Sequence, residues 1–167
     1  FAGVSRTNYF LENQNKTAFD GRDAMVAEAR FLRAYYHFEL VKWFGGIPIK
    51  NYEAALEGAG ERFVPGDELA IARSSSAQVY ALIESDLIYA VNNLEYTAPQ
   101  VGRVTKGAAE ALLGKAYLYQ NKFTEAATVL DNVINNGPYD LALDYATIFE
   151  SGGENNVESV FEVQYTD

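Results

Sequence analysis

The feature that most constrains the fold is one long segment, residues 22–44, whose apolar residues recur with the spacing of an α-helix. The segment stops at Gly45 and Gly46, with Pro48 just beyond, as helices commonly do. One apolar stripe comprises Met25, Ala29, Leu32, Tyr36, Leu40 and Trp43. A second stripe, roughly opposite, comprises Ala27, Phe31, Ala34, Phe38 and Val41. A helix that is apolar on two opposite faces predicts packing between two layers, as in a solenoid.

Two polar seams separate these stripes. They contain Arg30, Arg33 and His37 on one side and Glu28, Glu39 and Lys42 on the other. The two arginines have two interpretations, an ion-pair network that ties helices together through Asp86 or Glu84, or an anion site. The ion-pair network is favoured because a neighbouring helix supplies the carboxylates. His37 is the only histidine, so the sequence predicts a hydrogen-bonded interior histidine and not a metal ligand.

Two further helices flank this segment along the chain. Residues 3–14 have apolar side chains at helical spacing and look like the end of a helix. Residues 45–74 hold much of the glycine and proline, which predicts a long excursion and not a tight hairpin. Ser75 then begins a helix that continues to about Leu94, and Gln78 completes a predicted capping box with that serine.

A hairpin of two short helices follows, residues 106–120, capped by Thr105, and residues 123–136. Its sequence matches the tetratricopeptide pattern, a repeat of about 34 residues. The matching residues are Leu113, Gly114, Tyr117, Ala126 and Pro138, with Leu130 in place of the usual Phe. Small side chains at Gly114 and Ala126 would let the paired helices approach closely. An imperfect second copy comprises Leu32, Arg33, Tyr36, Leu87 and Ala90.

The predicted fold is therefore all-α, with tetratricopeptide-like stacked helix pairs in a right-handed helical layer and a long insertion loop over residues 45–74. We expect a single helical domain over residues 1–167. Within it, residues 139–151 are expected to form a short helical turn or two. Residues 157–165 alternate in polarity and predict a short C-terminal strand-like segment. No earlier stretch offers that strand a partner, so we expect the sequence to be a fragment of a longer protein.

Composition and charge exclude several classes of function. A formal net charge of −10 argues against nucleic acid, whose backbone is bound by clustered Lys and Arg. A net negative charge of this size more often keeps a protein soluble than forms a ligand-binding site. The absence of cysteine removes disulfides and sulfur-based zinc sites, and no apolar run is long enough to span a bilayer. The first residue is Phe1 and not Met, so we expect the natural N-terminus to lie upstream. Any signal peptide or lipid anchor would be in those preceding residues.

The sequence gives no support for catalysis, a cofactor or a metal site. Glycine spacing over residues 102–107 resembles a phosphate loop, but Ala108 and Ala109 stand where Lys and Ser or Thr are needed. No GxSxG motif occurs, and the carboxylates are scattered over predicted solvated faces. We therefore predict a protein that is not an enzyme.

Residues 27–49, "AEARFLRAYYHFELVKWFGGIPI", resemble the signature of the SusD/RagB family of outer-membrane nutrient-binding lipoproteins. The resemblance continues in "GVSRTNYFLEN" near the start and in "VTKGAAEALLGKAYLYQ" from Val104. It extends to "YDLALDYATIFESGGENNVESVFEVQY" from Tyr139, in the family's order.

This resemblance implies a surface-exposed lipoprotein of the outer membrane that sits on a TonB-dependent, SusC-like transporter and captures oligosaccharides or other nutrients. It also implies that this chain is the tetratricopeptide-bearing N-terminal portion, without the lipid-anchored cysteine. Membrane association would then depend on an anchor that this sequence does not contain.

Sugar recognition usually stacks aromatic rings on pyranose faces and places amides and carboxylates on the hydroxyls. Tyr52, between Asn51 and Glu53 in the excursion, is the candidate ligand-binding residue, although a tyrosine there also fits a packing role. Trp43 lies in the apolar stripe and is predicted to be core. The alternative function is a generic tetratricopeptide adaptor whose concave face holds a peptide.

Overall fold

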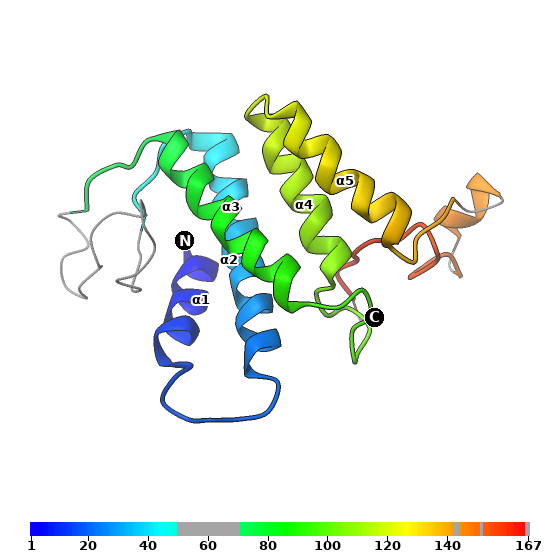
Figure 1. Cartoon of the computed structure of the whole chain (residues 1–167), viewed down its shortest axis with the longest axis horizontal. Helices are drawn as coiled ribbons and strands as arrows, with labels where there is room; N and C mark the ends of the chain where they lie inside the picture. Colours follow the sequence, from blue (N-terminus) through cyan, green and yellow to red (C-terminus); the bar gives the residue numbers. More distant parts are fainter. Residues whose placement is uncertain (50–70, 142–143, 151, 166–167) are drawn as a thin grey trace. The chain divides into compact units, whose positions relative to one another are not determined.

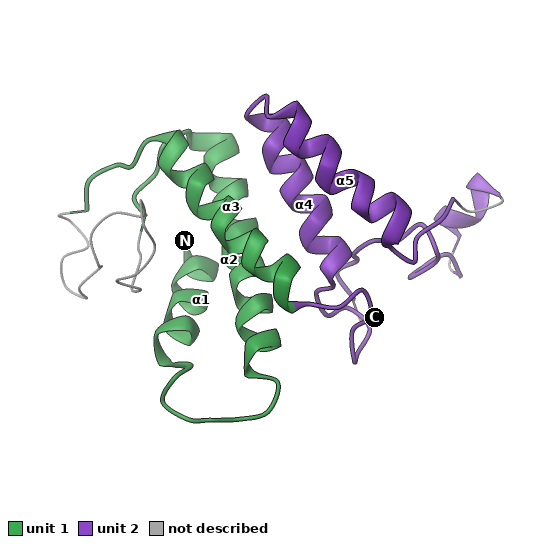
Figure 2. Cartoon of the chain, in the orientation of Figure 1, with its two compact units in different colours: residues 1–93 green, residues 94–167 purple. Residues whose placement is uncertain are grey.

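The computed structural model describes residues 1–49, 71–141, 144–150 and 152–165. Its elements in chain order are α1 (Ala2–Asn13), α2 (Arg22–Phe44), α3 (Ser76–Asn93), α4 (Lys106–Tyr119), α5 (Phe123–Asn136) and the 3₁₀ turn η1 (Tyr145–Phe149) (Figure 1). The predicted all-α, tetratricopeptide-like class is confirmed. The chain divides into two compact units, residues 1–93 and 94–167, which are described in turn (Figure 2).

Helix boundaries agree closely with the sequence pattern because local capping residues fix them. The Ser75 backbone N–H donates to the Gln78 side chain at 2.8 Å, and the Gln78 N–H donates to the Ser75 hydroxyl at 3.2 Å. This reciprocal pair is the predicted capping box. The Thr105 hydroxyl accepts from the Ala108 N–H at 3.2 Å and caps α4, as predicted.

In unit 1, α2 is the central helix and contacts both α1 and α3. The second predicted stripe of α2 is buried, together with one face of α3. The buried apolar residues of these two helices are Val26, Ala27, Ala29, Phe31, Ala34, Phe38, Val41, Val79, Leu82, Ile83, Leu87 and Ala90. A smaller cluster joins Leu11 of α1 to Val26 and Ala29.

The prediction that both stripes of α2 are buried is wrong for most of the first stripe, in which Ala29 is buried. Met25 and Leu32 are 42% and 36% exposed, and Trp43, predicted to be core, is 79% exposed. The buried arc instead runs through the polar seam, where Arg33 and His37 are fully enclosed. The seam can be interior because its charges are neutralised there, which a count of apolar residues does not reveal.

The enclosed charge is neutralised by an ion pair between α2 and α3. Arg33 donates from Nε to Asp86 Oδ2 at 2.7 Å and from Nη2 to Asp86 Oδ1 at 2.8 Å. Arg33 Nη1 also donates to Asn8 Oδ1 of α1 at 3.0 Å, and Arg30 Nη1 lies 3.3 Å from Asp86 Oδ1. The ion-pair interpretation of the two arginines is therefore confirmed, and one guanidinium joins all three helices of unit 1.

His37 lies one turn after Arg33 and is completely buried. Its Nδ1 is 2.9 Å from the Arg33 carbonyl oxygen, which can only accept, so Nδ1 carries the proton. Burial lowers the pKa of His37 to about 4, an effect that the positive charge of Arg33 reinforces and the hydrogen bond to the Arg33 carbonyl opposes. The imidazole is therefore neutral at physiological pH.

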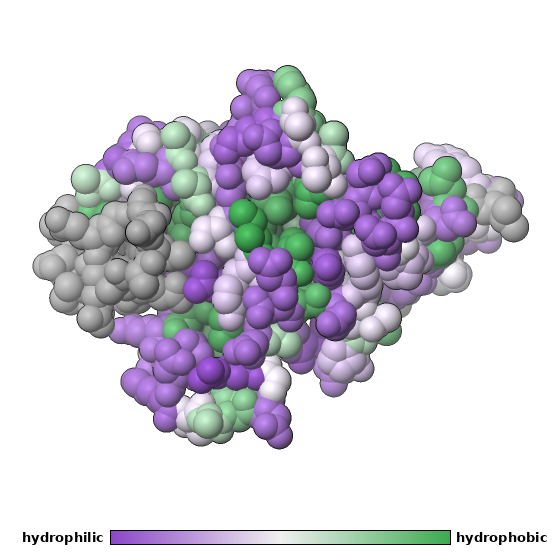
Figure 3. Space-filling model, viewed as in Figure 1, coloured by the Kyte–Doolittle hydropathy of each residue, from purple (hydrophilic) through white to green (hydrophobic). Residues whose placement is uncertain are grey.

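In unit 2, α4 and α5 form the predicted antiparallel pair. A Cβ placed on Gly114 would lie 2.6 Å from Leu130 Cδ2, so a side chain on residue 114 would force Leu130 to move. Of the other tetratricopeptide positions, Leu113 and Ala126 are buried, Tyr117 is half-buried, and Pro138 is exposed just beyond α5. Hydrophilic residues cover the C-terminal half of α5 on the face drawn in Figure 3.

The predicted C-terminal strand is wrong. Within the described residues, 157–165 form turns and irregular backbone without a strand partner. Asp140 donates its N–H to the Val157 carbonyl at 3.2 Å, but this contact does not continue as a ladder. Val163 and Tyr165 are exposed, so their alternation with polar residues buries neither of them. The predicted helical turn before this segment is confirmed as η1.

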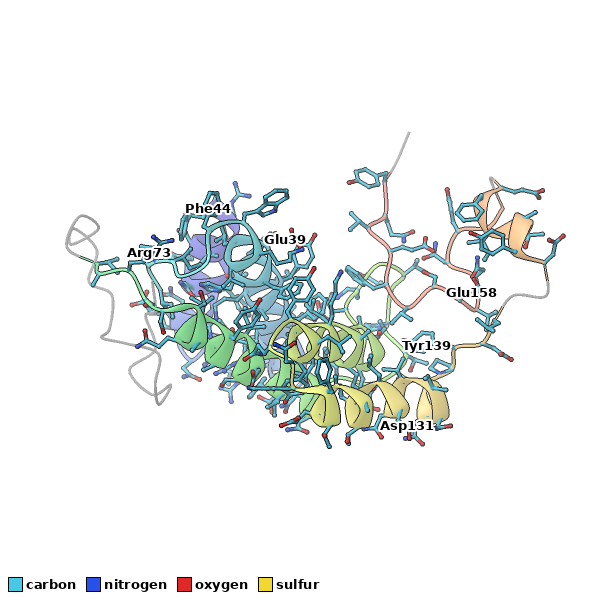
Figure 4. The ribbon with its side chains drawn as sticks, turned by 90° about the horizontal axis from the view of Figure 1, so that it is seen from above. Glu39, Phe44, Arg73, Asp131, Tyr139 and Glu158 are labelled. Carbon is cyan, nitrogen blue, oxygen red and sulfur yellow. The ribbon has the colours of Figure 1, made fainter. Side chains whose placement is uncertain are left out.

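Both ends of the predicted insertion are ordered beside the C-terminus of α2. Arg73 donates to the carbonyl oxygens of Phe44 and Gly46, and Figure 4 shows Arg73 and Phe44 at the same end of unit 1. The Ser74 N–H donates to the Ile47 carbonyl at 3.1 Å. Residues 50–70 lie outside the described residues.

Replacing Gly114 by valine is expected to lower the free energy of unfolding by about 2 kcal/mol, because the new side chain overlaps Leu130. Urea unfolding followed by circular dichroism measures the change. The matched control is Gly152→Val, since nothing lies within 4 Å of a Cβ at Gly152. Equal stability of the two variants would contradict the close approach of α4 and α5.

Replacing Asp86 by asparagine is expected to lower the free energy of unfolding by about 3 to 5 kcal/mol, because Arg33 would keep a buried charge without its counter-ion. The control, Glu39→Gln, removes an ion pair with Lys42 in which both side chains are partly exposed. That change should cost less than about 1 kcal/mol. Chemical denaturation of both variants at neutral pH measures the difference.

Protonation of His37 should destabilise the fold as pH falls. Its pKa is about 4 in the folded chain and about 6.5 in the unfolded chain, so the unfolded state binds the proton more tightly. The stability contribution is complete above about pH 6.5 and decreases by about 3 kcal/mol as pH falls to about 4. The stability of wild type and of His37→Leu is compared across this pH range. The difference between them separates the contribution of His37 from that of the carboxylates. A folded-state NMR titration of this single histidine with a midpoint near 6.5 would refute the assignment.

Candidate functional site

A groove of about 410 Å³ lies in unit 2, between the loop that precedes α4 and the C-terminal segment of the chain. Side chains with aromatic rings, amides and charges line it. Those that matter for its chemistry are Tyr96, Arg103, Tyr139, Asn155, Phe161 and Glu162. Figure 4 shows Tyr139 near the C-terminal segment that carries Glu158.

Tyr96 is held by hydrogen bonds at its hydroxyl end. The hydroxyl donates to Glu110 Oε2 at 2.9 Å and lies 3.4 Å from the Asn132 carbonyl, so it connects the loop to α4 and α5. Lys106 Nζ lies 5.4 Å from the centre of the Tyr96 ring. Burial and the hydrogen bond to Glu110 raise the pKa of Tyr96 to about 12, so the phenol stays protonated at physiological pH.

Tyr139 is the second anchored ring. A Cβ on Gly107 would lie 2.5 Å from Tyr139 Cε2, and one on Gly137 would lie 2.7 Å from Cδ2, so both glycines make room for the ring. The Tyr139 hydroxyl is also 3.3 Å from the hydroxyl of Thr105, the cap of α4. The ring therefore joins the end of α5 to the start of α4 while it lines the groove.

The opposite wall depends on an asparagine with left-handed backbone. Asn155 has φ of 53°, a conformation that asparagine tolerates better than most residues. Its N–H donates to Glu162 Oε1 at 3.0 Å, and its amide exchanges hydrogen bonds of 3.1 and 3.0 Å with the Gln164 amide. These bonds close residues 155–164 into a defined loop.

A second hollow of about 360 Å³ adjoins the groove and shares Ser159 and Glu162 with it. Its lining includes Glu154, Glu158 and Glu162, so three carboxylates gather on this side of unit 2. Arg103 is the one cationic residue among the described residues that line the groove. The hollow is therefore lined by acidic side chains, whereas the groove itself is lined by one acidic and one basic side chain, Glu162 and Arg103.

The groove presents several kinds of side-chain group that can contact a ligand. Aromatic rings, amides and a carboxylate can contact the apolar faces and hydroxyls of a polar organic molecule. Across the described parts of the chain, no group of three or more His, Asp or Glu side chains is placed to hold a metal ion. No helix among those residues is both long enough and apolar enough to cross a membrane.

Sequence reasoning did not find this groove. The predicted ligand residue Tyr52 lies outside the described residues, so its role stays a prediction. The sequence places Tyr96 and Tyr139 in loops, but it does not show that both rings line one groove. The α4–α5 hairpin brings them to the same groove. The available signal was composition alone: tyrosine, glutamine and arginine in a short loop before α4, and asparagine and glutamate near the C-terminus.

Comparisons with known proteins agree with the predicted resemblance. A family model described as starch-binding proteins that associate with the outer membrane matches residues 1–118. A curated relative, SusD-like protein P2 from Formosa agariphila, is 30% identical over 166 residues. The alignment covers 97% of this chain and 30% of the relative, so this chain spans about a third of the length of that protein.

Solved structures agree in fold as well. A SusD-like protein from Bacteroides fragilis superposes with a TM-score of 0.85 at 29% identity, over 98% of this chain and 32% of that one. A laminarin-binding SusD-like protein superposes with a TM-score of 0.83 at 31% identity, over 96% of this chain and 35% of that one. With most of the chain matched by the family model and nearly all of it superposed, the chain belongs to the SusD-like family.

Proposed function

We propose that the chain serves, within a longer SusD-like protein, in the capture of a nutrient oligosaccharide at the outer membrane. The observation that carries this proposal is the match of residues 1–118 to a family described as starch-binding and associated with the outer membrane. In this proposal residues 1–167 act as one helical scaffold. The longer protein would be a surface-exposed lipoprotein of the outer membrane.

The proposed ligand is a neutral glucan. The family model is described by starch binding and one solved structure by laminarin binding, and both polymers consist of glucose. The groove in unit 2 supports this proposal, because it combines aromatic rings with amide and carboxylate groups. Tyr52 stays a further candidate contact for the same ligand.

The proposed mechanism is binding without chemistry. His37, the only histidine, is fully buried in the unit 1 core, so its imidazole is not exposed to solvent. The Tyr96 phenol has a pKa of about 12 and is unsuited to proton transfer near neutral pH. A captured glucan would pass unaltered to the partner, which we propose is a TonB-dependent, SusC-like transporter.

Affinity purification of the complete gene product from detergent-solubilised outer membranes tests this proposal. Mass spectrometry of the bound fraction should identify a TonB-dependent barrel, because the capture role requires the binding protein to stay at its transporter. A tagged outer-membrane lipoprotein of another family, purified in parallel, is the control. Recovery of soluble cytoplasmic partners alone would refute the capture role and support the tetratricopeptide adaptor instead.

A further inference from the structure

We propose that residues 161–165 complete a β-sheet in the longer protein, by pairing with a strand in the residues that follow position 167. The inference is independent of the ligand and concerns a surface that the proposed function does not use. The sequence of the segment, "FEVQY", alternates apolar and polar residues as a half-buried strand does. Within the described residues the segment forms neither helix nor turn and has no strand partner.

The polar side of the segment is held in place by one residue, Asn155. Its N–H donates to Glu162 Oε1 at 3.0 Å, and its amide exchanges hydrogen bonds of 3.1 and 3.0 Å with the Gln164 amide. Glu162 and Gln164 therefore lie on the same side of the backbone, as residues two apart do in a strand. A Cβ on Gly102 would lie 2.6 Å from Gln164 Cγ, so the loop before α4 packs closely against this side. These contacts hold the segment in one conformation before any partner strand is added.

The apolar side of the segment is exposed. Phe161, Val163 and Tyr165 are 39%, 64% and 90% exposed. Aromatic and β-branched side chains favour strands because they pack against neighbours on the adjacent strand. We therefore expect the partner strand to place apolar side chains beside these three residues.

The backbone of the segment has hydrogen-bonding groups that a strand could use. Within the described residues, Val163, Gln164 and Tyr165 form no backbone–backbone hydrogen bond. A row of such N–H and C=O groups is a template for pairing with another strand. One added strand would satisfy these groups and cover part of the exposed apolar side at the same time.

The same polypeptide is the partner that pairs most easily with this segment. The chain aligns over 97% of its own residues with only 30% of a SusD-like relative, so the longer protein has ample sequence to supply a strand. A hairpin connects two antiparallel strands through roughly two to five residues, and strands that are consecutive in sequence are usually neighbours. Pairing within one polypeptide also has a higher effective concentration than pairing with a second molecule.

Hydrogen–deuterium exchange of the complete gene product, resolved to single residues by mass spectrometry, tests the pairing. Neighbouring residues of an antiparallel strand direct their N–H groups to opposite edges. Pairing at one edge should slow exchange at least about hundredfold, relative to an unstructured peptide, at residues 161, 163 and 165 or at residues 162 and 164. Fast exchange at all five positions would overturn the proposal, and so would equal protection at all five.

Substitution of Val163 in the complete gene product tests the apolar side. Val163→Asp should speed exchange of the protected amides by at least about tenfold, because pairing would place a charge among apolar side chains. Val163→Ile keeps a β-branched apolar side chain and is the matched control, so it should leave exchange unchanged. Wild-type protection in Val163→Asp would show that no apolar partner covers this side.

Two further measurements identify the partner. A chain terminated after position 167 should lose the protection of residues 161–165 while the amides of α2 and α4 stay protected, and retained protection would refute a partner beyond position 167. The complete gene product should keep its protection on dilution and without a transporter. Protection that falls on dilution would assign the edge to a second copy, and protection that requires a transporter would assign it to that protein. Either result would overturn pairing within one polypeptide, even if the terminated chain does not fold.

Discussion

Unit 1 depends on the ion pair between Arg33 and Asp86. The guanidinium makes two hydrogen bonds to the carboxylate and a third to Asn8, so one side chain determines how α1, α2 and α3 meet. A buried pair of this kind contributes little net stability compared with a well-packed apolar core, but the loss of one partner is costly. A helix that slid by one turn would leave a buried charge without its partner, so we expect the pair to disfavour other helix registers. His37, enclosed one turn further along α2, adds a second position at which charge is not tolerated.

The groove of unit 2 rests on a different kind of constraint. Its walls come from segments that are far apart in sequence and are joined through the α4–α5 hairpin. Tyr96 reaches both helices through Glu110 and the Asn132 carbonyl, and Tyr139 returns from the end of α5 to the first turn of α4. The same contacts that close the hairpin thus hold the rings that line the groove.

The sequence was most informative where local physics decides the outcome. Helical periodicity and the caps at Ser75 and Thr105 located the helices to within about two residues, and the small residue at Gly114 indicated the close helix pair. It was least informative where long-range contacts decide. Trp43 was assigned to the core because the pattern shows that a face is apolar but not whether anything covers it. The groove was missed for a related reason, since alternation and composition do not encode which loops meet.

The ordered ends of the insertion have a consequence for how such a protein can diversify. Arg73 and the Ser74–Ile47 hydrogen bond fasten the two ends of the excursion to each other and to the end of α2. Once the ends of a loop are joined, each doubling of its length costs only about 0.6 kcal/mol in closure entropy. The sequence between the fastened ends can therefore lengthen, shorten or change while the helices keep their register.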